Sequence, residues 1–80
     1  MKAIVTVHLK PGVLDPQARA IVHALASLGF GEVGEVRVGK VITLELATTD
    51  AAEARARADE MGRRLLANTV VETYAVEIVP

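Results

Sequence analysis

The apolar residues of this 80-residue chain follow two spacings in turn, and their order limits the fold more than any other feature. Apolar residues at every second position are typical of strands, and apolar residues three or four positions apart are typical of amphipathic helices. The two spacings predict the order strand, helix, strand, strand, helix, strand. The predicted strands are Lys2 to Leu9, Val33 to Val38, Val41 to Ala47 and Val70 to Val79.

Both predicted helices begin with an aspartate. Asp15 can accept a hydrogen bond from the free N–H groups of the first turn, and Pro16 suits the first helical position because it has no N–H. Asp50 can cap the second helix, with Glu53 completing a pattern like a capping box. Gly29 predicts the end of the first helix. We therefore assign structural capping roles to Asp15, Pro16 and Asp50.

A tight turn is predicted between the two middle strands. Gly39 and Lys40 separate two alternating segments, and glycine at the first turn position is typical of a type II′ hairpin. The segments before and after this turn are therefore expected to pair with each other as antiparallel neighbours.

This order of elements predicts a ferredoxin-like α+β fold, βαββαβ, in one domain over residues 1–80. Its four-stranded antiparallel sheet is expected to carry both helices on one face. The other face is half apolar, which favours self-association, with scattered surface aliphatics as the alternative explanation. The residues predicted on that open face are Ile4, Thr6, His8, Val41, Thr43, Ala75 and Val79.

The composition excludes several kinds of chemistry and partner. The absence of cysteine excludes thiol nucleophiles, iron–sulfur clusters and cysteine-ligated zinc. Nine basic residues against ten acidic ones leave no positive excess for a nucleic acid. The N-terminal segment lacks the apolar run of a signal peptide or a membrane span. We therefore expect a cytoplasmic protein with no nucleic-acid or membrane partner.

No catalytic group can be assigned on this chain. His8 lies in the first predicted strand, His23 lies on the first predicted helix and Ser27 lies near its end, with nothing to indicate a catalytic triad. A phosphate-binding glycine loop and a metal-ligating cluster are also missing from the sequence. We expect no catalytic residue, no metal site and no cofactor bound by the chain itself.

Polar loop residues are the better candidates for function. Polar groups lie beside apolar ones in the loop after the first strand, in the predicted hairpin and after the second helix, and binding residues gather on loops. The alternative is ordinary turn and capping chemistry at the same positions. The candidate partner contacts are Lys10, Arg37, Gly39, Lys40 and Asn68.

The same segments resemble the PurS family, the small subunit of phosphoribosylformylglycinamidine synthase. The similar motifs are LKPGVLDPQ at 9–17, VRVGK at 36–40, LLAN at 65–68, and VVE at 70–72 followed by Tyr74. The resemblance covers essentially the whole chain in order. It departs at Ala18, where family members often have glycine, and at Thr69, where they often have proline.

The resemblance implies a non-catalytic scaffold subunit in de novo purine biosynthesis. The synthase converts formylglycinamide ribonucleotide, glutamine and ATP into the formylglycinamidine ribonucleotide. The family implies that ATP and Mg²⁺ belong to a ligase subunit and that a separate glutaminase subunit releases ammonia. A PurS-like subunit is expected to bridge these two, to assist ammonia transfer, and to form a dimer or tetramer with itself.

Two other functions are compatible with the residues. The first is a free-standing regulatory domain that binds an amino acid between paired sheets. Such domains usually have a glycine-rich loop at a helix start, where this chain has Asp15 and Pro16. The second is an independent enzyme, which the scarcity of catalytic groups disfavours.

Overall fold

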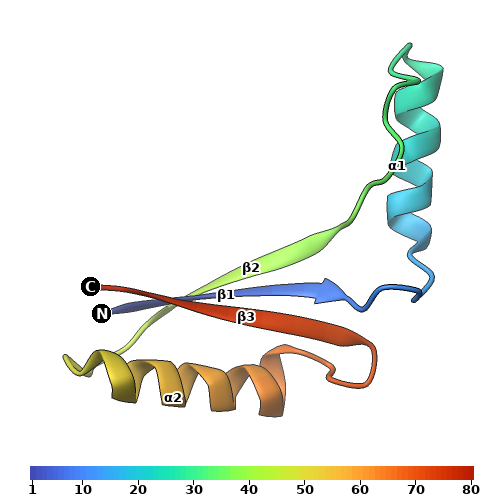
Figure 1. Cartoon of the computed structure of the whole chain (residues 1–80). Coiled ribbons are helices and arrows are strands. Elements are labelled where there is room, and N and C mark those ends of the chain that lie inside the picture. Colours follow the sequence, from blue (N-terminus) through green and yellow to red (C-terminus); the bar gives the residue numbers. More distant parts are fainter.

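A three-stranded antiparallel sheet forms the centre of the computed structural model, which describes all residues from Met1 to Pro80 (Figure 1). The strands are β1 (Lys2–Leu9), β2 (Gly39–Glu45) and β3 (Glu72–Val79), in the spatial order β2-β1-β3. The alternation in β1 gives the sheet one buried face, because Ala3, Val5 and Val7 are at most 1% exposed.

The predicted four-stranded sheet is wrong, since the structure contains three strands. Gly39 and Lys40 do not turn: they are the first residues of β2, where Gly39 lies opposite His8. Residues 33–38 belong to no helix or sheet. Alternating apolar residues indicate an extended segment, but they do not say which strand it pairs with, or whether its partner lies in the same chain.

Helix α2 (Ala51–Met61) covers the buried face of the sheet, over β3 and β1. A π-helical turn, η1 (Gly62–Leu66), continues it, so the predicted second helix widens in its last turn. Asp50 caps α2 through its carboxylate, which accepts from the N–H groups of Ala52 and Glu53. The core between these elements consists of Val5, Val7 and Ala67, with partly buried Ile42, Leu44, Leu66, Tyr74 and Val76 packed around it.

Helix α1 (Pro16–Ser27) stands away from the sheet (Figure 1). The expectation that both helices cover one sheet face is therefore wrong. The molecule measures 48 × 26 × 13 Å, and its radius of gyration is 16.0 Å, against about 12 Å for a compact chain of this length. We call residues 10–38 the arm and the rest of the chain the body.

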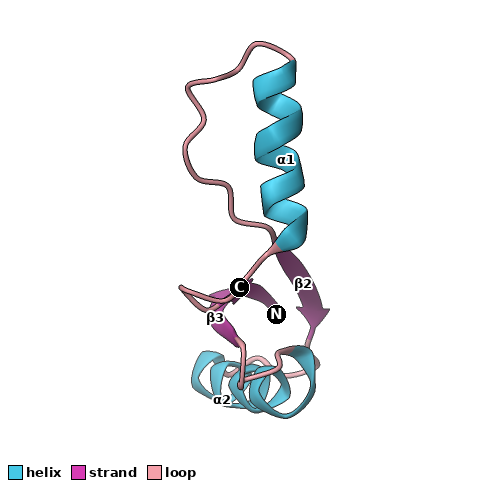
Figure 2. Cartoon of the chain, turned by 90° about the vertical axis from the view of Figure 1, so that its right-hand side faces the viewer, coloured by secondary structure: helices cyan, strands magenta, loops and turns pink.

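The arm folds on itself rather than on the body. The chain that follows α1 returns alongside the helix (Figure 2). Val33, Val36 and Val38 on this return are half-buried, and Ala18 is the buried residue of the helix. The apolar stripe of α1 is thus partly covered by its own return segment rather than by the sheet.

Both ends of α1 lie where the sequence predicts them. The Asp15 carboxylate accepts a hydrogen bond from Ala18 N at 3.0 Å, and Pro16 occupies the first turn. Gly29 has φ +97°, a left-handed conformation that favours glycine and ends the helix.

Candidate interface at the arm end of the sheet

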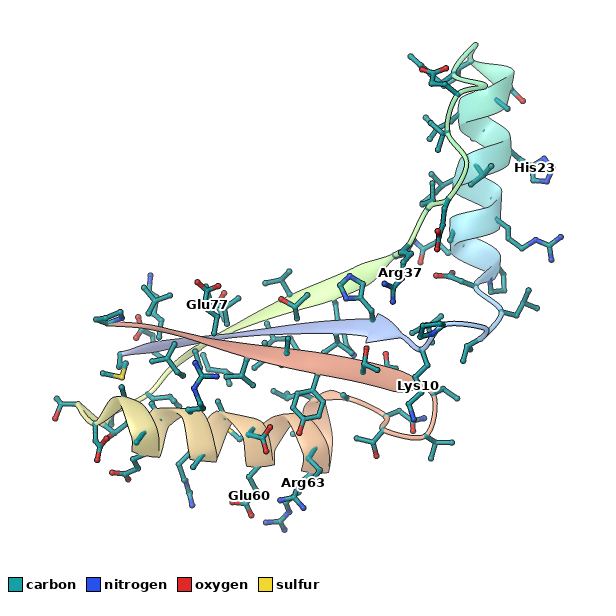
Figure 3. The ribbon with its side chains drawn as sticks, viewed as in Figure 1. Lys10, His23, Arg37, Glu60, Arg63 and Glu77 are labelled. Atoms are coloured by element: carbon teal, nitrogen blue, oxygen red, sulfur yellow. The ribbon has the colours of Figure 1, made fainter.

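The five predicted contact residues gather at one end of the sheet. There β1 ends, β2 and β3 begin, and the chain enters and leaves the arm (Figure 3). Lys10 N donates to Val71 O at 2.8 Å, which joins the first of these segments to the start of β3. No hydrogen bond or ion pair links the candidate side chains to one another.

Arg37 ties the arm to the body. Its Nη2 donates to the carbonyl oxygen of Leu9 at 3.0 Å, which joins the return segment of the arm to the end of β1. The predicted hairpin put Arg37 next to a turn, but the residue lies on the return segment of the arm instead. The guanidinium is exposed and has further N–H groups available for a partner.

Only glycine fits at position 39, because His8 and the backbone of Val7 lie close to its Cα. A Cβ atom built there would lie 2.6 Å from His8 Cδ2 and 2.6 Å from the carbonyl oxygen of Val7. The imidazole of His8 therefore packs directly on the backbone where the arm becomes β2. A hollow of about 240 Å³ opens beside this contact, with Gln17, Lys40 and Glu72 among its lining residues.

Asn68 shapes the turn that leads into β3. Its Oδ1 accepts from Val70 N at 3.2 Å, and its N–H donates to the Glu72 carboxylate at 2.6 Å. Its carbonyl oxygen accepts from the N–H groups of Val71 and Glu72. These contacts give Asn68 the turn chemistry that the sequence analysis held as the alternative to a partner contact.

One contact that stabilises the body, between Tyr74 and α2 with its last turn, was not predicted from the sequence. The Tyr74 hydroxyl donates to Asp59 Oδ1 at 3.0 Å, and its ring packs against Gly62, where a Cβ would lie 2.9 Å from the ring. Desolvation raises the pKa of Tyr74, and the hydrogen bond and negative charge of Asp59 raise it further. The one available signal was a glycine inside an otherwise helical pattern, which marks close packing when it is required.

Lys10, Arg37 and Lys40 place three positive charges at the arm end, where the carboxylate of Glu72 also lies. Lys40 and Arg37 are exposed, and Lys10 is half-buried. No group of three histidine, aspartate or glutamate side chains is arranged to hold a metal ion. None of the helices has the length and apolar character needed to cross a membrane. The geometry suits recognition of an acidic protein surface.

Comparison with known proteins identifies the family. A family model described as PurS, phosphoribosylformylglycinamidine (FGAM) synthase, matches residues 2–80. The chain belongs to the PurS family. The subunit PurS of phosphoribosylformylglycinamidine synthase from Synechocystis is 47% identical over 72 residues, which cover 90% of this chain and 72% of that protein. The resemblance seen in the loop motifs is confirmed. Members of this family are a subunit of phosphoribosylformylglycinamidine synthase, which is a ligase complex.

Solved PurS structures share the fold. The Bacillus subtilis PurS structure in its C2 crystal form has a TM-score of 0.87 and 43% identity, over 99% of this chain and 98% of that one. A chain of the Thermotoga maritima PurLQS structure has a TM-score of 0.88 and 29% identity, over 98% and 95%. A chain whose residues 10–38 lay elsewhere could not match this well over its whole length, so the projecting arm is part of what these structures share.

Proposed function

We propose that this chain is the scaffold subunit of phosphoribosylformylglycinamidine synthase. It holds the glutaminase and ATP-dependent ligase subunits in register and assists the passage of ammonia between them in purine biosynthesis. The match to PurS over residues 2–80 carries the proposal. The match to a chain of the Thermotoga maritima PurLQS structure supports an assembly with other subunits.

The arm end of the sheet is the proposed contact surface for these partners. Lys10, Arg37 and Lys40 come from the two segments that join the arm to the body, and their charges are accessible. Lysine offers a point charge and arginine a bidentate fork for carboxylates. Asn68 and Gly39 hold the backbone of this surface in place, through the contacts described above.

The chemistry belongs to the partners under this proposal. ATP and Mg²⁺ bind the ligase subunit, glutamine is hydrolysed on the glutaminase subunit, and this chain binds no cofactor. The chain acts in the cytoplasm as one domain, associates with itself, and contacts neither nucleic acid nor membrane.

Reconstitution with the ligase and glutaminase subunits tests the proposal. The chain is expected to be required for glutamine-dependent synthesis and to matter less for synthesis from ammonia. The variant Lys10→Ala/Lys40→Ala should lower glutamine-dependent turnover about five- to tenfold at limiting chain concentration and low salt, because two charges at the rim of an interface are lost. The difference from the natural chain should shrink at high salt, because salt screens the same contacts in the natural chain. The two lysines are preferred to Arg37, because Arg37 also holds the Leu9 carbonyl.

The matched control removes two positive charges from α2 and the turn after it. Arg57→Ala/Arg64→Ala loses an exposed ion pair between Arg64 and Glu60 and is expected to keep full activity. Equal loss in both variants would show that net charge matters rather than the arm end. Full glutamine-dependent turnover without the chain would overturn the scaffold function itself.

A further inference from the structure

The outer edge of β3 has backbone groups that no strand of this chain uses. Lys10 N donates to Val71 O at 2.8 Å, which continues the ladder between β1 and β3 and fixes which residues of β3 face β1. Because the direction of these groups alternates along a strand, Tyr74, Val76 and Ile78 direct their N–H and C=O groups away from β1. Unpaired groups at a sheet edge are a template for a further strand.

One of these outward groups already has a partner. Nη1 of Arg55, on α2, donates to the carbonyl oxygen of Val76 at 3.1 Å. Val76 lies in the middle of β3, opposite Val5 of β1. A further strand would lie about 4.8 Å from β3 and would need this carbonyl for its own ladder. The guanidinium of Arg55 therefore occupies the position that the backbone of that strand would take.

The other side chains beside this edge would not obstruct a neighbouring strand. A hollow of about 460 Å³ lies between α2 and β3, lined by Ala52, Arg55, Ala56, Asp59, Tyr74 and Val76. Two of the four residues that α2 places there are alanines, and Asp59 accepts the hydrogen bond of the Tyr74 hydroxyl. Arg55 is thus the only long side chain that α2 places in this hollow.

The contact of Arg55 with β3 replaces an alternative within α2. Arg55 and Asp59 are four residues apart, a spacing at which opposite charges on a helix can form an ion pair. They form none, although Arg64 and Glu60 do so at the same spacing. The guanidinium of Arg55 is therefore held by the sheet edge rather than by its own helix.

We propose that Arg55 closes the outer edge of β3 to a second copy of this chain and thereby keeps self-association from continuing copy after copy. A charged side chain laid over an edge strand is a common means of preventing edge-to-edge pairing. The edge is a latent interface, and the hydrogen bond from Arg55 to the Val76 carbonyl keeps it shut. This inference goes beyond the scaffold function and does not depend on it.

The partner that fits this edge, once the guanidinium is removed, is β3 of another copy. Antiparallel pairing about a twofold axis at Val76 would set Tyr74 opposite Ile78, so that the outward groups of the two strands meet. The same axis would set Ala75 opposite Glu77, which leaves no like charges directly opposite one another. The edge is therefore complementary to itself.

Closing this edge matters because the sheet has another one. On the outer side of β2, the outward backbone groups of Val41, Thr43 and Glu45 make no hydrogen bond within the chain. Pairing at one edge by a twofold axis closes after two copies, whereas pairing at both edges can add copies without end. The contact from Arg55 therefore limits self-association to a closed set of copies.

Sedimentation velocity over a range of chain concentrations tests the proposal. Arg55→Ala should raise the weight-average mass about twofold or more above that of the natural chain at about 100 μM, and the mass should keep rising with concentration. Arg55→Lys should keep the natural mass, because a lysine also places a charge over the edge.

The matched control is Arg57→Ala, which removes the same charge from the same helix. Arg57 is exposed and lines a different hollow, beside Leu46 and Met61. This variant is expected to keep the natural mass at every concentration. Far-ultraviolet circular dichroism of each variant shows whether the chain is still folded.

Engineered cysteines identify the edge that pairs, on a chain that has no cysteine of its own. Ala75→Cys and Glu77→Cys are at exposed positions, and directly opposite residues of this kind have Cα atoms about 4.5 Å apart, within the range of a disulfide. A mixture of the two cysteine variants should cross-link about fivefold faster or more when both also carry Arg55→Ala, because the edge is then open.

Three results would overturn the proposal. An unchanged mass for Arg55→Ala would show that Arg55 only ties α2 to the sheet. An equal rise in mass for Arg57→Ala would show that lost charge, rather than an open edge, causes the association. Larger assemblies of Arg55→Ala without faster cross-linking between positions 75 and 77 would place the new contact elsewhere on the chain.

Discussion

The body and the arm use similar residues but bury them to very different extents. In the body, β1 lies between two strands and under a helix, and Val5 and Val7 are at most 1% exposed. In the arm, the stripe of α1 includes Ile21 and Leu25, which remain half exposed. A helix forms in either setting when its caps and spacing are right, but only the sheet provides a core within one chain. The arm is thus a folded element whose apolar surface is still available.

The largest expected effect is a difference in stability loss when a buried apolar side chain is shortened in the body and in the arm. Val5→Ala should lower the free energy of unfolding by about 2–3 kcal/mol, because two methyl groups leave a closed site. Ile21→Ala in the arm should cost about 1 kcal/mol at low protein concentration, since part of that side chain already faces water. Urea denaturation of both variants, followed by circular dichroism, measures the difference. Equal losses would mean that α1 is as well buried as the sheet.

A glycine in each region sharpens the comparison. Gly62→Ala should lower stability by about 1–2 kcal/mol, because the added Cβ would lie 2.9 Å from the Tyr74 ring and the ring has to move. Gly31→Ala in the arm has no atom within 4 Å of its Cβ and should change stability by less than about 0.5 kcal/mol. Thermal melts of the pair provide the measurement, and a neutral Gly62→Ala would show that the π-helical turn is loosely packed.

The smallest expected effect is a pH dependence confined to the body. The pKa of Tyr74 is raised above 10.0 in the folded chain, so the neutral phenol binds its proton more tightly there than in the unfolded chain. That contribution to stability is complete below pH 10 and is lost as the pH rises through the folded-state pKa. Denaturation midpoints of the natural chain and of Tyr74→Phe should therefore diverge below pH 10 and converge above it. Parallel curves would show that the hydrogen bond from Tyr74 to Asp59 does not stabilise the neutral phenol.

Much of the fold could be predicted because it depends on neighbours in sequence. Asp15 and Asp50 are aspartates before amphipathic segments, and both accept hydrogen bonds from the first turn of a helix. Gly29 ends α1 with a positive φ, which few other residues adopt. The alternation in β1 and β3 is read from one strand at a time, so these strands follow from the sequence within a few residues.

The wrong predictions concern which segments pair with each other, and a local sequence pattern does not determine this. The dipeptide Gly39-Lys40 suits a turn, but glycine is needed there because His8 lies against the backbone. Residues 33–38 have the pattern of a strand without a partner in the chain. The prediction of a four-stranded sheet assumed that every strand-like segment pairs within one copy. The same assumption misplaced Arg37, whose neighbour is the Leu9 carbonyl.

The small core described above has a thermodynamic consequence. Only eight of 80 residues are buried in the isolated chain. The heat capacity of unfolding follows the apolar area exposed, at about 12–15 cal/mol/K per residue for ordinary domains, and should fall below that range here. Area buried only on assembly makes the midpoint of melting rise with protein concentration. Dilution then acts as a mild denaturant, and copies made in excess of their partners become the preferred targets of proteolysis.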